Sequence, residues 1–141
     1  MHRTITCRKR LHEMRLVESP LCTVCQCLDD LSHFFFYCNY VSNFWNSIIS
    51  WINSVLNSSI SLNEFDILFG LTGSDDASTV MNFLILHAKF FIHRQRIQDI
   101  HELHIIAFKN QLKVKLTIEK IICEREKPWK FAKFQPLLNS L

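Results

Sequence analysis

The sequence predicts an all-α domain with one small zinc knuckle near its N-terminus, and three observations support this fold class. The chain of 141 residues has two glycines and three prolines, whereas a many-stranded β-protein needs more turn residues. Apolar residues recur every three or four positions over long segments, which is the spacing of a helix face. Four side chains that bind metal ions gather in one short segment, residues 22–38.

The composition fits a single globular domain, with 48% hydrophobic and 21% charged residues. The N-terminal residues lack the apolar stretch of a secretory signal. The longest apolar run, residues 80–92, is too short to span a bilayer and contains His87 and Lys89. We therefore expect an intracellular protein that makes no membrane contact, with its six cysteines as thiols or metal ligands rather than disulfides.

Three segments are expected along the chain. Residues 1–18 should form a basic N-terminal helix, over positions 4–17, and Ser19-Pro20 should end it because proline disfavours helix in the residue before it. Residues 19–42 should form the zinc knuckle. Residues 43–141 should form a helical C-terminal region.

Within the knuckle, a tight turn over residues 21–28 precedes a short helix over residues 31–38. Asp29 or Asp30 can cap this helix by accepting a hydrogen bond from a backbone N–H. Asn39 is well suited to a left-handed residue at a helix end. These features predict that the helix stops at Asn39.

The C-terminal region should contain three helices and one helical turn. An amphipathic helix is expected over residues 40–56, a short turn capped by Asn63 over residues 64–69, and long helices over residues 76–98 and 103–125. On the last helix, four lysines fall within about 40° of one another at 100° per residue, namely Lys109, Lys113, Lys120 and Lys127. Such a stripe is most often a solvated face, and it is also a candidate for phosphate contacts.

The net charge of +3 conceals a strong asymmetry along the chain. Residues 21–78 contain no lysine or arginine and six acidic residues, whereas residues 1–20 and 79–141 carry charges of +3 and +6. A polyanion would therefore meet the two ends of the chain and avoid the middle.

The strongest motif is a Cys-x2-Cys pair followed by a histidine and a further cysteine, at Cys22, Cys25, His33 and Cys38. Thiolate and imidazole ligands in a closed set of four are typical of a structural zinc site with no open position for catalysis. The alternative is that these cysteines are buried core residues. Cys27 lies too close to Cys25 to share the tetrahedron easily and is interpreted as a spare thiol, while Cys7 and Cys123 are expected to pack in the core.

The run SPLCTVCQCLDDLSHFFFYCNYVSNFW resembles the zinc-binding region that follows the polymerase core in reverse transcriptases of LINE-type (non-LTR) retrotransposons. The matching positions are Leu21-Cys22, Cys25, Asp29-Asp30, His33, Phe34–Phe36, Cys38 and Trp45. The resemblance continues less specifically towards residue 126. The resemblance implies a detached C-terminal piece that lacks the polymerase palm, with residues 1–18 as a remnant of the region after the polymerase core. In that family this region is not catalytic and assists RNA or target binding, and the zinc site is structural.

Residues 21–78 lack cations, so we expect the knuckle to organise the fold rather than to bind phosphates. The candidate nucleic-acid contacts are Arg3, Arg8, Lys9, Arg10, Arg15, Lys109, Lys113, Lys120 and Lys127. Trp45 and Trp51 should belong to the core. Trp129, beside Lys127, Lys130 and Lys133, is the better candidate for an exposed stacking residue, and packing of the C-terminal tail against the helices is an equally good interpretation of it.

Other constellations are weaker. Asp29-Asp30 and Asp75-Asp76 superficially resemble the carboxylate pair of a polymerase. A polymerase site needs clustered carboxylates to hold two metal ions, and the sequence offers no third carboxylate in a matching motif. His101 and His104 lack a partner pair for a second metal, and nothing predicts a small-molecule substrate. The main alternative function is a zinc-stabilised domain that binds a protein, either a polymerase body or another partner. A sequence-reading zinc finger is weaker, because Phe34, Phe35 and Phe36 replace base-reading polar residues.

Overall fold

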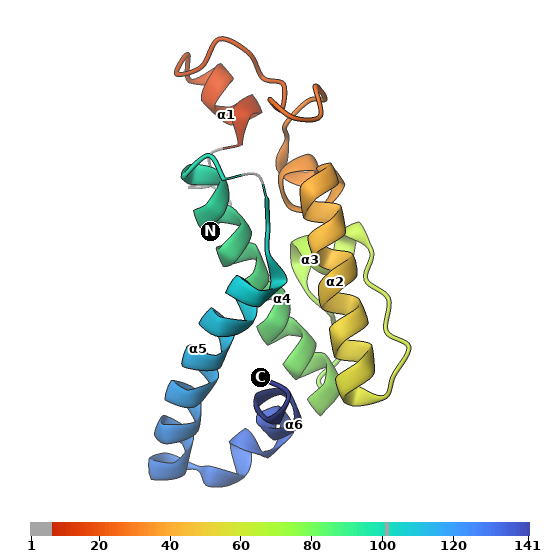
Figure 1. Cartoon of the computed structure of the whole chain (residues 1–141), viewed down its shortest axis with the longest axis vertical. Helices are drawn as coiled ribbons and strands as arrows, with labels where there is room; N and C mark the ends of the chain where they lie inside the picture. Colours follow the sequence, from red (N-terminus) through yellow and green to blue (C-terminus); the bar gives the residue numbers. More distant parts are fainter. Residues whose placement is uncertain (1–6, 101) are drawn as a thin grey trace.

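The computed structural model describes residues 7–100 and 102–141, and it confirms the all-α prediction. Over these residues there is no strand, apart from an isolated bridge between Leu21 and Leu28. The helices are α1 (Arg8–Glu13), α2 (Asn39–Leu56), α3 (Glu64–Phe69), α4 (Asp76–Ile97), α5 (Ile105–Glu126) and α6 (Gln135–Asn139), with a π-helical turn η2 (His33–Tyr37) and a 3-10 segment η3 (Pro128–Phe134). Figure 1 shows α1 and the cysteine-rich loop at one end of an elongated molecule, with the C-terminal end of α5 at the other.

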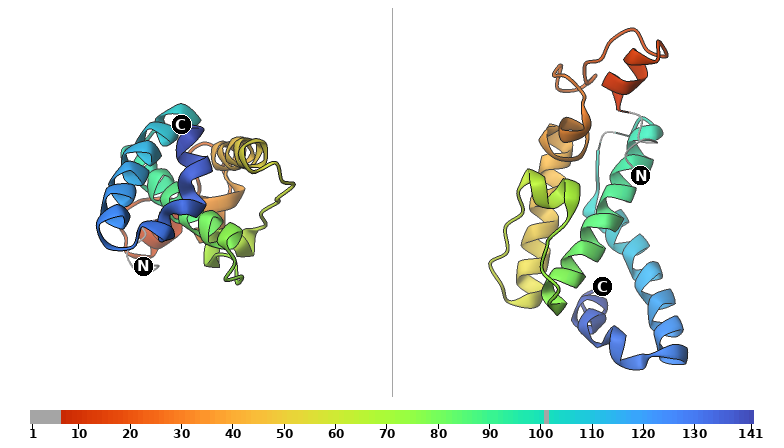
Figure 2. Two further views of the ribbon diagram at one scale, coloured as in Figure 1. Left: turned by 90° about the horizontal axis from the view of Figure 1, so that it is seen from below. Right: turned by 180° about the vertical axis from the view of Figure 1, so that it is seen from behind.

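Three aromatic rings join the three long helices. Phe44 of α2 stacks on Phe91 of α4 at 5.3 Å between ring centroids, and Phe108 of α5 meets both rings at 5.5 and 5.6 Å. All three side chains are buried. The two views of Figure 2 agree that α4 lies between α2 and α5. Packing of this triad places the N-terminal half of α5 against the other two helices.

The end of the chain folds back onto the helices. After Pro128, η3 and α6 turn inward and bury Phe131 and Leu137, while Phe134 packs against Phe83 of α4 at 5.0 Å. Trp129, in contrast, stays 71% exposed, so of the two interpretations that the sequence left open for this residue the structure favours the exposed one. No helix in the described part of the chain is long and apolar enough to cross a membrane.

The expected helix bounds agree with the structure to within two residues for α2, α3, α4 and α5. The Asn63 cap of α3 is confirmed, because its side chain accepts from the Asp66 N–H and the Asp66 carboxylate accepts from the Asn63 N–H in return. Trp45 is buried, and its ring N–H donates to the carbonyl of Phe35 at 2.6 Å, whereas Trp51 is half-buried.

Two expectations about the N-terminal part are wrong. The basic helix covers Arg8–Glu13 rather than residues 4–17, because the chain leaves the helix at Met14 and Arg15 adopts a left-handed conformation with φ 60°. Residues 4–6 lie outside the described residues. Asn39 does not stop a helix but begins α2, since Cys38 has the extended ψ of 134° that precedes a helix. The left-handed asparagine is Asn57, at the other end of α2.

Candidate metal centre

The four predicted ligands come together in the structure. One ligand atom from each of Cys22, Cys25, His33 and Cys38 lies within 4.8 Å of the other three. Cys22, His33 and Cys38 are buried, and Cys25 is partly exposed. A Cys3His group of this size can hold one metal ion.

The first ligand pair is positioned by a closed turn. The backbone N–H of Cys22 donates to the carbonyl of Cys27 at 2.7 Å, and the N–H of Gln26 donates to the carbonyl of Cys22 at 3.0 Å. Gln26 closes this turn in a left-handed conformation with φ 58°. Because a non-glycine residue occupies that region at a cost, the hydrogen bonds of the turn must outweigh a local strain.

The second ligand pair is positioned by the start of a helix. The Asp30 carboxylate accepts from the backbone N–H of His33 at 2.9 Å, so Asp30 rather than Asp29 caps the segment. The chain then makes the single π-helical turn η2 and enters α2 at Asn39, whose N–H lies 3.5 Å from the Sγ of Cys25. His33 Nε2 is buried and has no hydrogen-bond partner among the described residues. An orphaned imidazole nitrogen beside three thiols is the arrangement expected of a metal ligand.

Arg96, near the end of α4, contacts the ligand group, and the sequence did not single it out. Its guanidinium forms an ion pair with Asp29 at 3.1 Å, donates to the carbonyl of Phe34 at 3.3 Å and lies 4.0 Å from the Sγ of Cys22. The same group sits 4.2 Å above the ring of Phe34. Asp29, 1% exposed, also accepts from the backbone N–H of Arg8 at 2.9 Å. This network ties the metal centre to both α1 and α4.

The surroundings shift the pKa values of two thiols of the group, Cys22 and Cys38, in opposite directions. Burial raises the pKa of the Cys38 thiol to about 12. Burial also raises the pKa of Cys22, but the backbone N–H groups of Cys25 and Val24 and the charge of Arg96 outweigh it, and its pKa falls below the ordinary value. Cys22 therefore ionises more readily than Cys38, which needs the charge of a metal ion to lose its proton.

The imidazole is kept neutral by its surroundings. Burial lowers the pKa of His33, and the carboxylate of Asp29 opposes this shift. A neutral imidazole is the form that donates a lone pair to a metal ion. The chain therefore holds His33 ready for coordination at neutral pH.

The remaining cysteines behave as expected. Cys7 is buried, Cys123 is half-buried against the core, and Cys27 is exposed with its thiol directed to the carbonyl of Cys25 at 3.4 Å. Cys27 does not belong to the group of four ligand atoms.

The predicted basic residues form two separate sets. Arg8, Lys9, Arg10 and Arg15 lie at the α1 end of the molecule, whereas Lys113, Lys120 and Lys127 follow α5 towards the opposite end (Figure 1). Lys109 is half-buried, with its ammonium 4.7 Å above the ring of Trp51. Arg3 lies outside the described residues.

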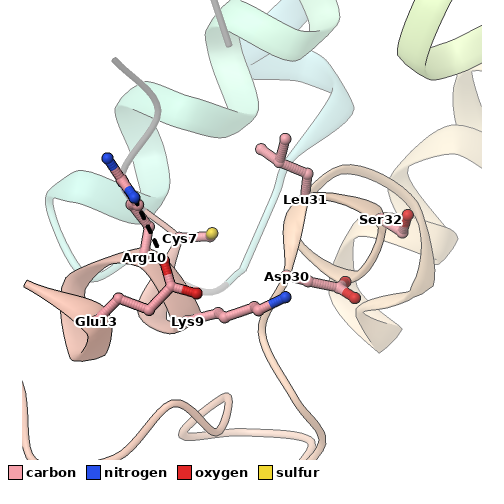
Figure 3. Close-up of a pocket in the computed structure, with 7 residues that line it drawn as sticks. All are labelled: Cys7, Lys9, Arg10, Glu13, Asp30, Leu31 and Ser32. Carbon is pink, nitrogen blue, oxygen red and sulfur yellow. Dashed lines mark hydrogen bonds and ion pairs between the residues drawn. The ribbon is translucent and has the colours of Figure 1, made fainter. Parts of the chain in front are cut away.

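Two members of the α1 set, Lys9 and Arg10, lie near acidic residues. Arg10 pairs with Glu13 at 3.4 Å. In Figure 3 the ammonium of Lys9 points toward the carboxylate of Asp30, across a pocket of about 330 Å³ that also receives the thiol of Cys7. The α1 end is thus less positive than its sequence indicates.

Comparison of this chain with protein-family models, curated proteins and solved structures found no significant match. Its function is therefore inferred from the residues of the metal centre and from the surface of the helices.

Proposed function

We propose that this chain is an intracellular, zinc-dependent, non-catalytic domain that binds RNA or DNA, similar in role to the C-terminal region of LINE-type reverse transcriptases. The exposed Trp129, flanked by Lys127 and Lys130 at the end of the α5 lysine stripe, is the observation that carries the nucleic-acid role.

The donor set and its spacing support zinc as the metal. Two sulfur ligands at about 2.3 Å from a tetrahedral ion lie roughly 3.8 Å apart, and the Sγ atoms of Cys25 and Cys38 are 3.7 Å apart. That separation is far longer than a disulfide bond. Three thiolates and one imidazole fill a tetrahedron, and such closed sites are structural. These four residues would hold the ion and leave no coordination position for a reacting water.

The setting of Trp129 supports contact with single-stranded nucleic acid. An aromatic ring can stack on a base of any identity, and neighbouring cations neutralise the phosphates. Lys127 and Lys130 are exposed beside it, and Lys113 is exposed further along α5. We propose that these residues guide a strand along the outer side of α5.

The non-catalytic role is supported by the contacts of Asp29-Asp30 and Asp75-Asp76, whose carboxylates form hydrogen bonds and an ion pair that stabilise the fold. Asp29 pairs with Arg96, and Asp30 caps the segment of His33. Asp75 accepts from the hydroxyl of Ser78 at 2.6 Å at the start of α4. Carboxylates used in this way are not gathered to hold two catalytic Mg²⁺ ions.

The zinc proposal is tested by metal analysis of protein purified without chelator. We expect one zinc per chain, with Cys22, Cys25 and Cys38 protected from alkylation and Cys27 reactive. His33→Ala should lose the metal and unfold the segment before α2, because binding energy at such a site is folding energy. Zinc-free protein that is folded and alkylates at all of these thiols would reject the proposal.

The nucleic-acid proposal is tested by titration with single-stranded RNA at several salt concentrations. Reversing Lys113, Lys120 and Lys127 to glutamate should weaken binding and flatten the salt slope by roughly 0.7 for each lysine that neutralises a phosphate in the complex. Reversing Lys9 and Arg10 should have a smaller effect, since Arg10 already pairs with Glu13. Trp129→Ala should weaken binding by about 1–3 kcal/mol if one base stacks there.

Phe65→Ala provides the matched control for Trp129→Ala, because Phe65 is also well exposed, at 59%, but lies among acidic residues. RNA affinity that is indifferent to both sets of charge reversals would reject nucleic-acid binding by these residues. It would favour the second candidate, a zinc-stabilised domain that binds a polymerase body or another protein. The exposed apolar residues of α5 are the observation in favour of that candidate.

A further inference from the structure

Helix α5 has two apolar sides, although one would suffice for its packing. Phe108, Leu112 and Leu116 face the core and are buried. On the other side, Val114, Ile118, Ile121 and Ile122 are 45–58% exposed. Their spacing of four, three and one positions places them together on one outward stripe. Single exposed apolar residues are ordinary, but four on one helix face indicate an interaction surface.

The stripe continues across a groove onto α4. Phe90, 55% exposed, and Leu86, 49% exposed, lie four residues apart on the same side of α4. Phe90 and Val114 both line a groove of about 240 Å³ between the two helices, and Phe108 and Leu112 contribute to its lining. The groove is therefore an apolar depression between two rigid helices.

The charges along this groove have one sign. Arg94 of α4 and Lys115 of α5 line it, and no aspartate or glutamate is among the lining residues. Glu119, one turn further along α5, acts on the nearby His87 but does not line the groove. An apolar depression with a positive margin is complementary to apolar residues flanked by carboxylates.

We propose that the α4–α5 groove docks an amphipathic helix of a partner protein, with apolar anchors between Phe90 and Val114 and carboxylates against Arg94 and Lys115. A helix supplies such anchors at intervals of three and four residues, which matches the run of the α5 stripe. This inference rests on the interaction role given as the second candidate above and concerns a different surface from the proposed RNA contacts.

The two surfaces lie on different sides of α5. At 100° per residue, the lysine stripe and the exposed apolar stripe are separated by roughly 150° around the helix axis. The partner helix and a nucleic-acid strand can therefore bind at the same time. This separation also allows the two proposals to fail independently.

The test uses the zinc-loaded full chain and two designed 18-residue helical peptides that share one leucine face. One peptide has glutamates beside that face and the other has lysines, and binding is followed by fluorescence anisotropy. We expect the glutamate peptide to bind at least tenfold more tightly than the lysine peptide. Phe90→Ser with Val114→Ser should weaken its binding at least tenfold, and Arg94→Glu with Lys115→Glu should reverse the preference between peptides.

Phe65→Ser with Phe69→Ser is the control, because both rings are more than half exposed but lie on α3, outside the groove. It should leave peptide binding unchanged. All variants should keep the circular dichroism spectrum and the metal content of the unmodified chain. Their RNA affinity should also be unchanged, except in Arg94→Glu with Lys115→Glu, which removes positive charge. Equal binding of both peptides, or equal losses in the control, would overturn the proposal. A dimer seen by sedimentation that Phe90→Ser with Val114→Ser abolishes would also overturn it, since the groove would then belong to a second copy.

Discussion

At the residue scale, the candidate metal centre is contacted by a side chain that is not one of its four ligands, and we expect its stability to depend on that contact. Arg96 forms an ion pair with the buried carboxylate of Asp29 at 3.1 Å, and both side chains are less than a tenth exposed. Removing one partner of a buried ion pair leaves the other charge without compensation. Arg96→Met should therefore lower the free energy of unfolding of the zinc-loaded protein by about 3–5 kcal/mol. Urea denaturation followed by circular dichroism measures this loss.

The double variant Arg96→Met with Asp29→Asn separates the ion pair from simple packing. Because no charge remains buried, the double variant should be more stable than Arg96→Met alone. Arg94→Met, two positions earlier on α4, has no partner of this kind among the hydrogen bonds of the metal centre and should cost less than about 1 kcal/mol. Equal losses in Arg94→Met and Arg96→Met would show that the ion pair has no special role.

The turn that presents Cys22 and Cys25 contains a second residue-scale prediction. Gln26 holds φ at 58°, where a side chain costs about 1–2 kcal/mol and glycine costs little. Gln26→Gly should raise stability by about 0.5–1 kcal/mol after the greater freedom of glycine in the unfolded chain is allowed for. Gln26→Val should lower stability, because a β-branched residue fits this conformation poorly. Thermal unfolding of the zinc-loaded variants would check both signs, and a more stable valine variant would contradict the strain argument.

The ligand set could be predicted from sequence, whereas Arg96 could not. Cys22, Cys25, His33 and Cys38 lie close along the chain, so local spacing carries the signal. Arg96 is 74 residues from Cys22, and its contact exists only because α4 packs across the knuckle. The sequence shows that residues 21–78 contain no lysine or arginine, but only the structure shows that Asp29 is buried and therefore needs a cation from elsewhere in the chain.

At the element scale, helix ends were predictable where side chains cap them within one turn. The reciprocal bonds of Asn63 and Asp66 are such a case. The prediction for Asn39 was wrong because asparagine suits both the end and the start of a helix. The extended backbone of Cys38 places Asn39 at the start of α2. The second apolar side of α5 was not predicted. Phe108, Leu112 and Leu116 already form a complete buried stripe, and the helical spacing does not show that Ile118 belongs to a second, exposed one.

Helix α4 carries titratable groups into the interior, and this makes stability depend on pH. Burial lowers the pKa of His93, whose Nε2 is buried without a hydrogen-bond partner among the described residues. Because the unfolded chain binds the proton more readily, stability should be full above pH 6.5 and should fall as pH drops from about 6.5 through the lower folded pKa. His93→Phe keeps a ring beside Phe34, 6.1 Å away in the native protein, and removes the titration.

The measurement is the stability difference between His93→Phe and the unmodified chain at pH 7.5 and 5.5, both with excess zinc. The difference should move in favour of His93→Phe as the pH falls, since that variant has no imidazole to protonate at this position. His12→Phe is the control, because His12 is exposed and contacts the carbonyl of Val17 at the surface. A pH-independent difference would show that His93 is protonated equally in the folded and unfolded chains.

At the scale of the whole molecule, the fold has two ends that depend on different interactions. The α1 end is held by the ligand group and the Asp29–Arg96 network, with few buried side chains of its own. The other end is held by the packing of α5, η3 and α6 through Phe131 and Leu137. The aromatic triad of α2, α4 and α5 lies between them. Metal removal should therefore act unevenly along the long axis of Figure 1.

We expect chelation of the metal to release residues 7–37 and the last turn of α4 while the triad stays folded. Without the ion, Cys38 returns to its protonated state and the thiols lose the bond energy that closes the turn. Arg96 then loses the carboxylate and thiolate that hold the end of α4.

Hydrogen exchange before and after chelation measures this local release directly. Protection should fall by at least tenfold around α1 and η2 and should change little around Phe108 and Leu116, which are buried residues of α5. Arg96→Met removes the ion pair with Asp29 without changing a ligand, so it should produce the same partial loss of protection with the metal still bound. A uniform loss of protection over all helices would instead show that the metal stabilises one cooperative unit.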